Sequence, residues 1–62
     1  MMMNMTKMKQ GDKFWCSWMH RTIFFRRSYF NKRRGTMMYE FEDIADVIID
    51  LTEAQIAKLE KR

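Results

Sequence analysis

The chain has 62 residues, of which 47% are hydrophobic, 15% aromatic and 32% charged, and its formal net charge is +4. A chain this short has room for one domain and buries only about 60% of the surface that its unfolded form exposes, which leaves little scaffold for a catalytic cleft. Its aromatic content differs from that of disordered chains, which are poor in aromatic residues. The single cysteine excludes an intramolecular disulfide, and this favours the reducing cytoplasm as the location.

The N-terminal segment is rich in methionine and contains two lysines, without the apolar region and small-residue cleavage site of a signal peptide. We predict a flexible tail over residues 1–10 and a single small domain over residues 11–62. A membrane-spanning helix needs about 20 consecutive apolar residues. The best stretch, residues 14–25, is shorter and contains Arg21, so we expect no such helix.

The charge is divided unevenly along the chain. Residues 1–35 carry nine cations against one acid, which gives +8, whereas residues 36–62 carry seven acids against three cations, which gives −4. Seven of the nine aromatic residues also lie in the first part. The sequence therefore divides into a basic aromatic half and an acidic aliphatic half.

The basic half favours strands, because aromatic residues are common in sheets. We predict strands over residues 13–20, 22–30 and 36–41. The segment Asn31–Gly35 between the last two has the composition of a hairpin loop, in which Gly35 can adopt a positive φ angle. A hairpin is therefore predicted over residues 22–41. The competing interpretation is one amphipathic helix over residues 13–30, because short apolar runs fit both periods.

The acidic half favours helices. A first helix, over about residues 42–51, is predicted because four apolar residues follow the i, i+3, i+4, i+7 spacing of one helical stripe. These residues are Ile44, Val47, Ile48 and Leu51. Thr52 and Gln55 have the spacing of a capping box, flanked by the apolar pair Leu51 and Ile56, and predict a second helix over about residues 53–61. The predicted fold class is α+β, with a small antiparallel sheet of two to three strands followed by one or two C-terminal helices.

Catalysis is not expected. Cys16 and His20 would share one face of a strand, so a thiol–imidazole pair is conceivable, but no third orienting group or oxyanion hole accompanies them. The same two residues are the only thiol and imidazole in the chain, too few for a structural zinc site. We therefore predict no enzymatic activity, no cofactor and no metal site.

The predicted binding residues lie in the basic half. Five cations bracket the second strand of the sheet and its loop, and they are Arg26, Arg27, Lys32, Arg33 and Arg34. Four aromatic residues are candidates for an exposed surface beside them, and they are Trp15, Trp18, Phe24 and Phe30. The purely structural interpretation is that the aromatic residues form the core and the cations keep the protein in solution.

These residues suggest three functions. The first is a small effector that binds an acidic protein surface, because interfaces are rich in Trp, Phe, Met and Arg. Such an effector could be an inhibitor of a larger host protein. Small inhibitors of this general style are encoded by phages. The alternative is nucleic-acid binding, with the cations on phosphates and the aromatic rings on bases. The third is membrane-surface binding by a basic amphipathic helix at residues 13–30. Exposed apolar surface also favours a homodimer.

Overall fold

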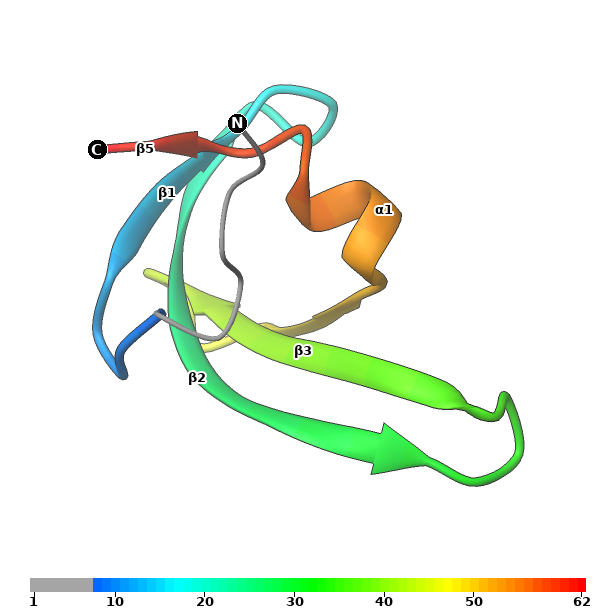
Figure 1. Cartoon of the computed structure of the whole chain (residues 1–62). Coiled ribbons are helices and arrows are strands. Elements are labelled where there is room, and N and C mark those ends of the chain that lie inside the picture. Colours follow the sequence, from blue (N-terminus) through cyan, green and yellow to red (C-terminus); the bar gives the residue numbers. More distant parts are fainter. Residues whose placement is uncertain (1–7) are drawn as a thin grey trace.

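The computed structural model describes residues 8–62, so most of the tail predicted over residues 1–10 lies outside the described residues. The chain forms one antiparallel sheet of five strands in the order β4-β3-β2-β1-β5, with a single short helix (Figure 1). The elements are β1 (Lys13–Cys16), β2 (Arg21–Asn31), β3 (Thr36–Asp43), β4 (Ile48–Leu51), α1 (Glu53–Ile56) and β5 (Glu60–Lys61).

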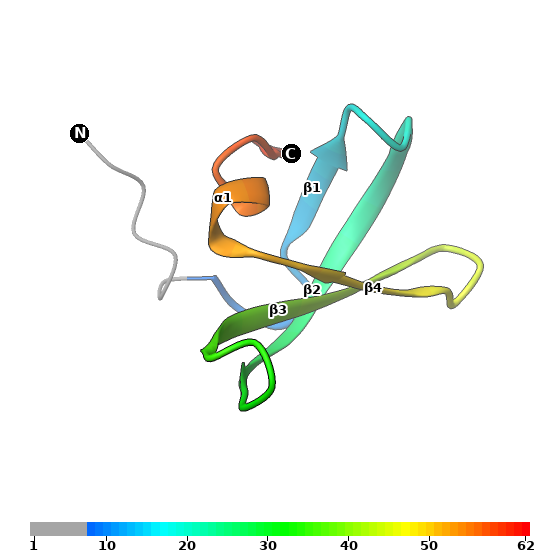
Figure 2. The same ribbon diagram turned by 90° about the vertical axis from the view of Figure 1, so that its right-hand side faces the viewer.

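The sheet is strongly bent, and its two edge strands are joined through the helix. Strands β1 to β3 each pair with the next strand along the chain, and β5 pairs with the free side of β1. The chain therefore leaves one edge of the sheet at β4, passes through α1 and returns to the other edge at β5. This path places α1 on the side toward which the sheet curls (Figure 2).

The core fills the inner face of the sheet, which we define as the face toward α1. Its buried members are Phe14, Cys16, Ile23, Phe25, Tyr39, Phe41, Ile49, Leu51, Ile56 and Leu59. Phe41 of β3 is fully buried, and its ring makes edge-to-face contacts with Phe14 at 5.8 Å and Phe25 at 5.4 Å between centroids. Burying an aromatic side chain of this size stabilises a fold by about 1.5–3 kcal/mol, so this cluster of three rings is the centre of the core.

The hairpin predicted over residues 22–41 is present as β2 and β3. Gly35 has a φ of 68°, as its place in the loop predicted, and its amide donates to the Asn31 carbonyl oxygen at 2.8 Å. The pairing shifts register between Phe25 and Arg27, so one residue, Arg26, forms a β-bulge. A bulge bends its strand and increases the local twist, which agrees with the curvature of the sheet.

The helix predicted over residues 42–51 is wrong. The chain finishes β3 at Asp43, turns, and forms β4 in its place. The turn is stabilised by the Asp43 carboxylate, whose Oδ1 accepts hydrogen bonds from the amides of Ala45 at 2.9 Å and Val47 at 3.0 Å. Asp46 adopts a φ of 64°, which no α-helix allows. A buried carboxylate therefore directs these backbone amides into a turn.

The second predicted helix begins where expected and ends early. The capping box is present. The backbone amide of Gln55 donates to Thr52 Oγ1 at 3.3 Å, and the backbone amide of Thr52 donates to Gln55 Oε1 at 2.9 Å. The helix nevertheless ends at Ile56 rather than near residue 61. Leu59 is buried in the core, and the next two residues pair with β1, which the continued helix would not permit.

The predicted α+β class, a sheet followed by helices, is therefore incorrect, and the protein is mainly β. Residues 13–30 likewise form β1, a turn and β2, and the alternative helix over these residues does not form. Within residues 8–62, no helix has the length and apolar character needed to cross a membrane.

Candidate interaction surface

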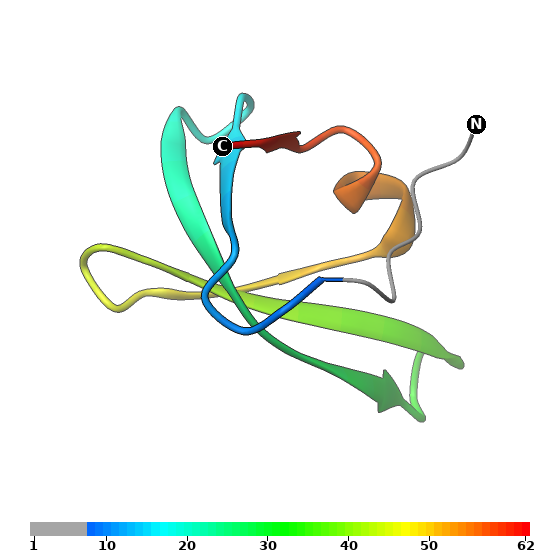
Figure 3. The same cartoon turned by 60° about the vertical axis from the view of Figure 1, so that its left-hand side comes forward.

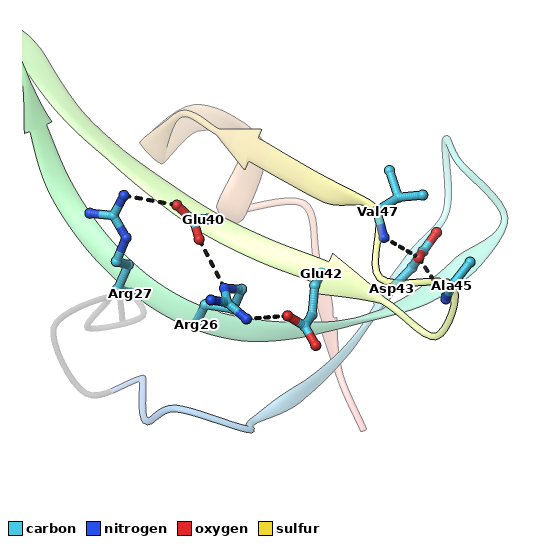
Figure 4. Close-up of polar contacts among 7 residues, drawn as sticks. All are labelled: Arg26, Arg27, Glu40, Glu42, Asp43, Ala45 and Val47. Carbon is cyan, nitrogen blue, oxygen red and sulfur yellow. Dashed lines mark hydrogen bonds and ion pairs between the residues drawn. The ribbon is translucent and has the colours of Figure 1, made fainter.

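The five predicted cations divide into two groups. The first group, Arg26 and Arg27, forms ion pairs with carboxylates of β3. Arg26 Nε donates to Glu40 Oε2 at 2.9 Å, and its Nη1 also pairs with Glu42. Arg27 Nη2 pairs with Glu40 Oε1 at 3.0 Å (Figure 4). Hydrogen bonds to Glu40 and then Glu42 raise the pKa of Arg26. These two arginines therefore join β2 to β3, and their charge is largely compensated within the sheet.

The second group of cations forms the end of the hairpin. Lys32, Arg33 and Arg34 occupy the turn between β2 and β3 and are exposed, and no ion pair among residues 8–62 engages them. Asn31 Oδ1 accepts a hydrogen bond from the Arg34 amide at 3.0 Å, which fixes the turn. Phe30 beside them is 57% exposed. We call Phe30, Lys32, Arg33 and Arg34 the hairpin tip, and it extends away from the rest of the chain (Figure 1).

Two of the predicted aromatic residues lie on the outer face of the sheet, away from the core. Trp15 of β1 pairs with Thr22 of β2, Phe24 pairs with Lys13, and both rings are half-buried. The Arg62 guanidinium lies 5.5 Å from the centre of a Trp15 ring. Lys13, Trp15, Thr22 and Arg62 line a shallow cleft of about 290 Å³. This cleft combines an aromatic wall with two cations.

The four predicted aromatic residues therefore do not share one surface. Trp18, 42% exposed, lies in the turn between β1 and β2, and Phe30 lies at the far end of β2. The outer face between these positions carries the carboxylates of Glu40, Glu42 and Asp50. In the register of the sheet, Glu40 of β3 is opposite Asp50 of β4, and Glu42 of β3 is opposite Phe24 of β2. The continuous basic aromatic face that the composition suggested is interrupted by carboxylates.

An exposed aliphatic surface, which the sequence did not predict, lies between β3 and β4. Ile44 is 86% exposed, Ile48 51% and Val47 47%, and we call these three residues the apolar turn. The prediction had placed them on the buried stripe of a helix. Strand-like alternation in Ile48–Leu51 was the available signal, because Ile49 and Leu51 are buried while Ile48 and Asp50 are exposed.

The apolar turn is held in place by Asp43, which is 5% exposed. Besides accepting from the amides of Ala45 and Val47, its carboxylate pairs through Oδ2 with Arg21 Nη1 at 2.6 Å (Figure 4 shows the amide contacts). The hydrogen bond from Val47 is the largest cause of a lowered pKa for Asp43, with further contributions from Ala45 and Arg21. The exposed side chain of Ile44 therefore lies on an ordered turn.

No protein-family model, curated protein or solved structure matches the chain, so its function has to be inferred from the geometry of its own surface. The hairpin tip and the apolar turn each combine exposed apolar groups with charge. They lie at the two ends of β3, and Figure 3 shows them at opposite sides of the molecule.

The residues considered for catalysis are not arranged for it. Cys16 is fully buried in the core, and burial raises the pKa of its thiol, so the reactive thiolate is disfavoured. His20 lies in the turn after β1 with a φ of 54° and is exposed. Among residues 8–62, no three side chains of His, Cys, Asp or Glu are grouped so as to hold a metal ion.

The burial of Cys16 predicts how its thiol will react. In the native protein at neutral pH, we expect Cys16 to resist alkylation by iodoacetamide, because both access and thiolate formation are hindered. The same thiol should react readily when urea unfolds the chain. Mass spectrometry after timed alkylation measures both rates, and rapid modification of the native protein would contradict the buried position of Cys16.

Proposed function

We propose that this protein is a non-enzymatic effector that binds an acidic surface of another protein through its hairpin tip. The observation that carries the proposal is the tip itself. Three consecutive cations have no ion pair among residues 8–62, and they stand beside a half-exposed phenylalanine at the projecting end of the sheet. An inhibitor that covers part of a larger protein is the form of effector that we expect, and its free cysteine is compatible with the cytoplasm.

The composition and order of the tip support this proposal. Arginine and aromatic residues are enriched at protein interfaces. The turn is ordered by the hydrogen bonds of Asn31 to Arg34 and Gly35 before any partner binds. A preordered loop loses less conformational entropy on binding, so a short tip is a suitable docking element.

A triple substitution tests the proposal. Changing Lys32, Arg33 and Arg34 to serine should abolish capture of a stoichiometric partner in pull-downs from nuclease-treated lysate. The free energy of unfolding should stay close to that of the wild type, because the three side chains are exposed and the turn is held through backbone groups and Asn31. Urea unfolding followed by circular dichroism measures this second quantity.

The matched control removes the same charge elsewhere. Lys9, Lys13 and Lys58 are also exposed cations without an ion pair among the described residues. Their replacement by serine should leave the captured partner in place. If both triple variants lose the partner equally, net charge alone accounts for binding. If the tip variant still captures the partner, the proposal is refuted.

Nucleic-acid binding is the second candidate, and the cleft around Trp15 is the observation that favours it. An aromatic ring next to Lys13 and Arg62 could stack an unpaired base and contact its phosphate. The carboxylates of Glu40, Glu42 and Asp50 on the same face oppose a longer track of phosphates. Titration with single-stranded oligonucleotides at increasing salt separates the two candidates, because phosphate contacts weaken steeply with salt. No binding at physiological salt would discard this candidate.

Membrane-surface binding depends on a helix that does not form. It required an amphipathic helix over residues 13–30, and this segment forms β1 and β2 instead.

A further inference from the structure

The charge of the β2–β3–β4 region changes sign along the sequence. Residues 26–39 contain five cations and no acid, and residues 40–53 contain six acids and no cation. The cations at the hairpin tip and three of the acids, Asp46, Asp50 and Glu53, belong to no ion pair among residues 8–62. The unpaired cations therefore lie at one end of β3, and the Asp46 carboxylate lies at the other end. Asp50 is opposite Glu40 in the middle of β3, and Glu53 accepts a hydrogen bond from the Tyr39 hydroxyl.

Each of these charged ends also carries exposed apolar side chains. The hairpin tip presents Phe30, and the apolar turn presents Ile44, Val47 and Ile48. Asp46 lies within the apolar turn and is exposed. One end is thus an aromatic residue with three cations, and the other is an aliphatic surface with one unpaired carboxylate, Asp46. The two surfaces are complementary in charge, and both lose water-exposed apolar area when they meet.

One molecule cannot bring its own two ends together. The eight residues of β3 separate them, which corresponds to about 26 Å at about 3.3 Å per residue. Both ends are also held by ordered turns, through Asn31 at the tip and Asp43 at the apolar turn. The hairpin tip of one copy can reach the apolar turn only on a second copy.

We propose that copies of this chain associate head to tail, with the hairpin tip of one copy docked on the apolar turn of the next. The inference rests on the proposed role of the tip as a docking element, and it names the second copy as an occupant. Such an interface joins two different surfaces and leaves one of each free at the ends of the assembly. The association therefore grows with protein concentration, and salt weakens it because unpaired charges meet across it.

Two variants remove one surface each. Ile44→Lys replaces the most exposed side chain of the apolar turn with a cation that repels the hairpin tip, and it should raise the dissociation constant by about tenfold or more, as is usual for an apolar anchor. The tip variant with Lys32, Arg33 and Arg34 changed to serine removes the other surface. Ala54→Lys, on the exposed side of α1, adds the same charge elsewhere and should associate like the wild type. Circular dichroism checks that each variant is folded, and Ile44→Ser tests the apolar turn without adding charge.

Sedimentation velocity over a wide concentration range gives the decisive readings. We expect the wild type to increase in mass with concentration, each single-surface variant to remain a monomer, and an equimolar mixture of the two variants to form a heterodimer that grows no further. A heterodimer is expected because each variant keeps the surface that the other lacks. A wild type that stays monomeric, a tip variant that still associates, or a mixture that stays monomeric would overturn the inference.

These outcomes also separate this inference from the proposed function. If the wild type is a monomer but the tip is still needed to capture a partner from lysate, only the head-to-tail association is refuted. If the mixture forms the heterodimer but no other protein depends on the tip for capture, the tip binds its own chain and the effector proposal is the one that fails.

Discussion

Replacing Phe41 with alanine is expected to leave the protein largely unfolded at room temperature. Its ring is fully buried and contacts both Phe14 and Phe25. Phe-to-Ala changes in cores cost about 3–5 kcal/mol, and a single core in a chain this small rarely supplies more than about 3–5 kcal/mol in total. The loss therefore matches the whole stability of the fold. Urea unfolding followed by far-ultraviolet circular dichroism measures it.

The matched control is Phe30→Ala, which makes the same chemical change at an exposed site. Phe30 is 57% exposed and lies outside the core cluster, so its removal should shift the unfolding midpoint only slightly. A Phe41→Ala protein with an unchanged midpoint would show that the three-ring cluster is not the centre of stability.

Replacing Asp43 with alanine should have the second largest effect. The change removes the acceptor for the amides of Ala45 and Val47 and leaves Arg21 without its partner. A polar group that is left without a hydrogen-bond partner inside the fold lowers the free energy of unfolding. We therefore expect a clearly lower urea midpoint and a disordered apolar turn. Asp50→Ala, which removes an exposed carboxylate from β4, is the control and should change the midpoint little. Equal effects of the two changes would contradict the structural role of Asp43.

The same carboxylate makes stability depend on pH. The pKa of Asp43 is lowered, first by the Val47 amide, so its ionised form stabilises the folded state at neutral pH. This contribution is lost as the pH falls through the folded-state pKa. Asp12, whose pKa is lowered by the Lys9 amide and then by Lys61, acts in the same direction. Asp43→Asn cannot titrate, so the difference between its urea midpoint and that of the wild type should shrink on acidification.

The hairpin could be predicted because its signals are local. Aromatic residues favour strands, and the loop Asn31–Gly35 contains both a side chain that can cap a turn and a glycine that can take a positive φ. The capping box of Thr52 and Gln55 is likewise a contact between residues three apart, and it forms as the spacing indicates. Each of these features depends on few residues outside its own segment.

The C-terminal elements could not be predicted because distant residues decide them. Ile44, Val47 and Ile48 fit a helical stripe, and the alternation in β4 fits a strand equally well. Asp43 selects the turn, and its carboxylate is held by Arg21, which is 22 residues away in the sequence. Helix α1 ends after one turn because the following residues pair with β1, a contact across most of the chain.

The candidate surface was predicted only in part for a related reason. A loop of three cations is exposed in almost any fold, so the position of Lys32, Arg33 and Arg34 followed from the sequence. The pairing of Arg26 and Arg27 with Glu40 depends on the bulge at Arg26, which shifts the register of β2 against β3. No sequence pattern indicated that bulge, and the ion pairs that accompany it largely compensate the charge of two of the five cations.

The pairing of β5 with β1 has a consequence for the order in which the chain folds. Strands β2 and β3 are joined by a four-residue turn, whereas β5 brings Lys61 opposite Phe14, and the Arg62 amide donates to the Lys13 carbonyl oxygen at 2.9 Å. The entropy lost on closing a loop increases with its length, and contacts between distant residues slow folding. We therefore expect the hairpin to form first and the C-terminal strand to join the sheet last. Glu60, Lys61 and Arg62, although few, are therefore expected to complete the contact that forms most slowly.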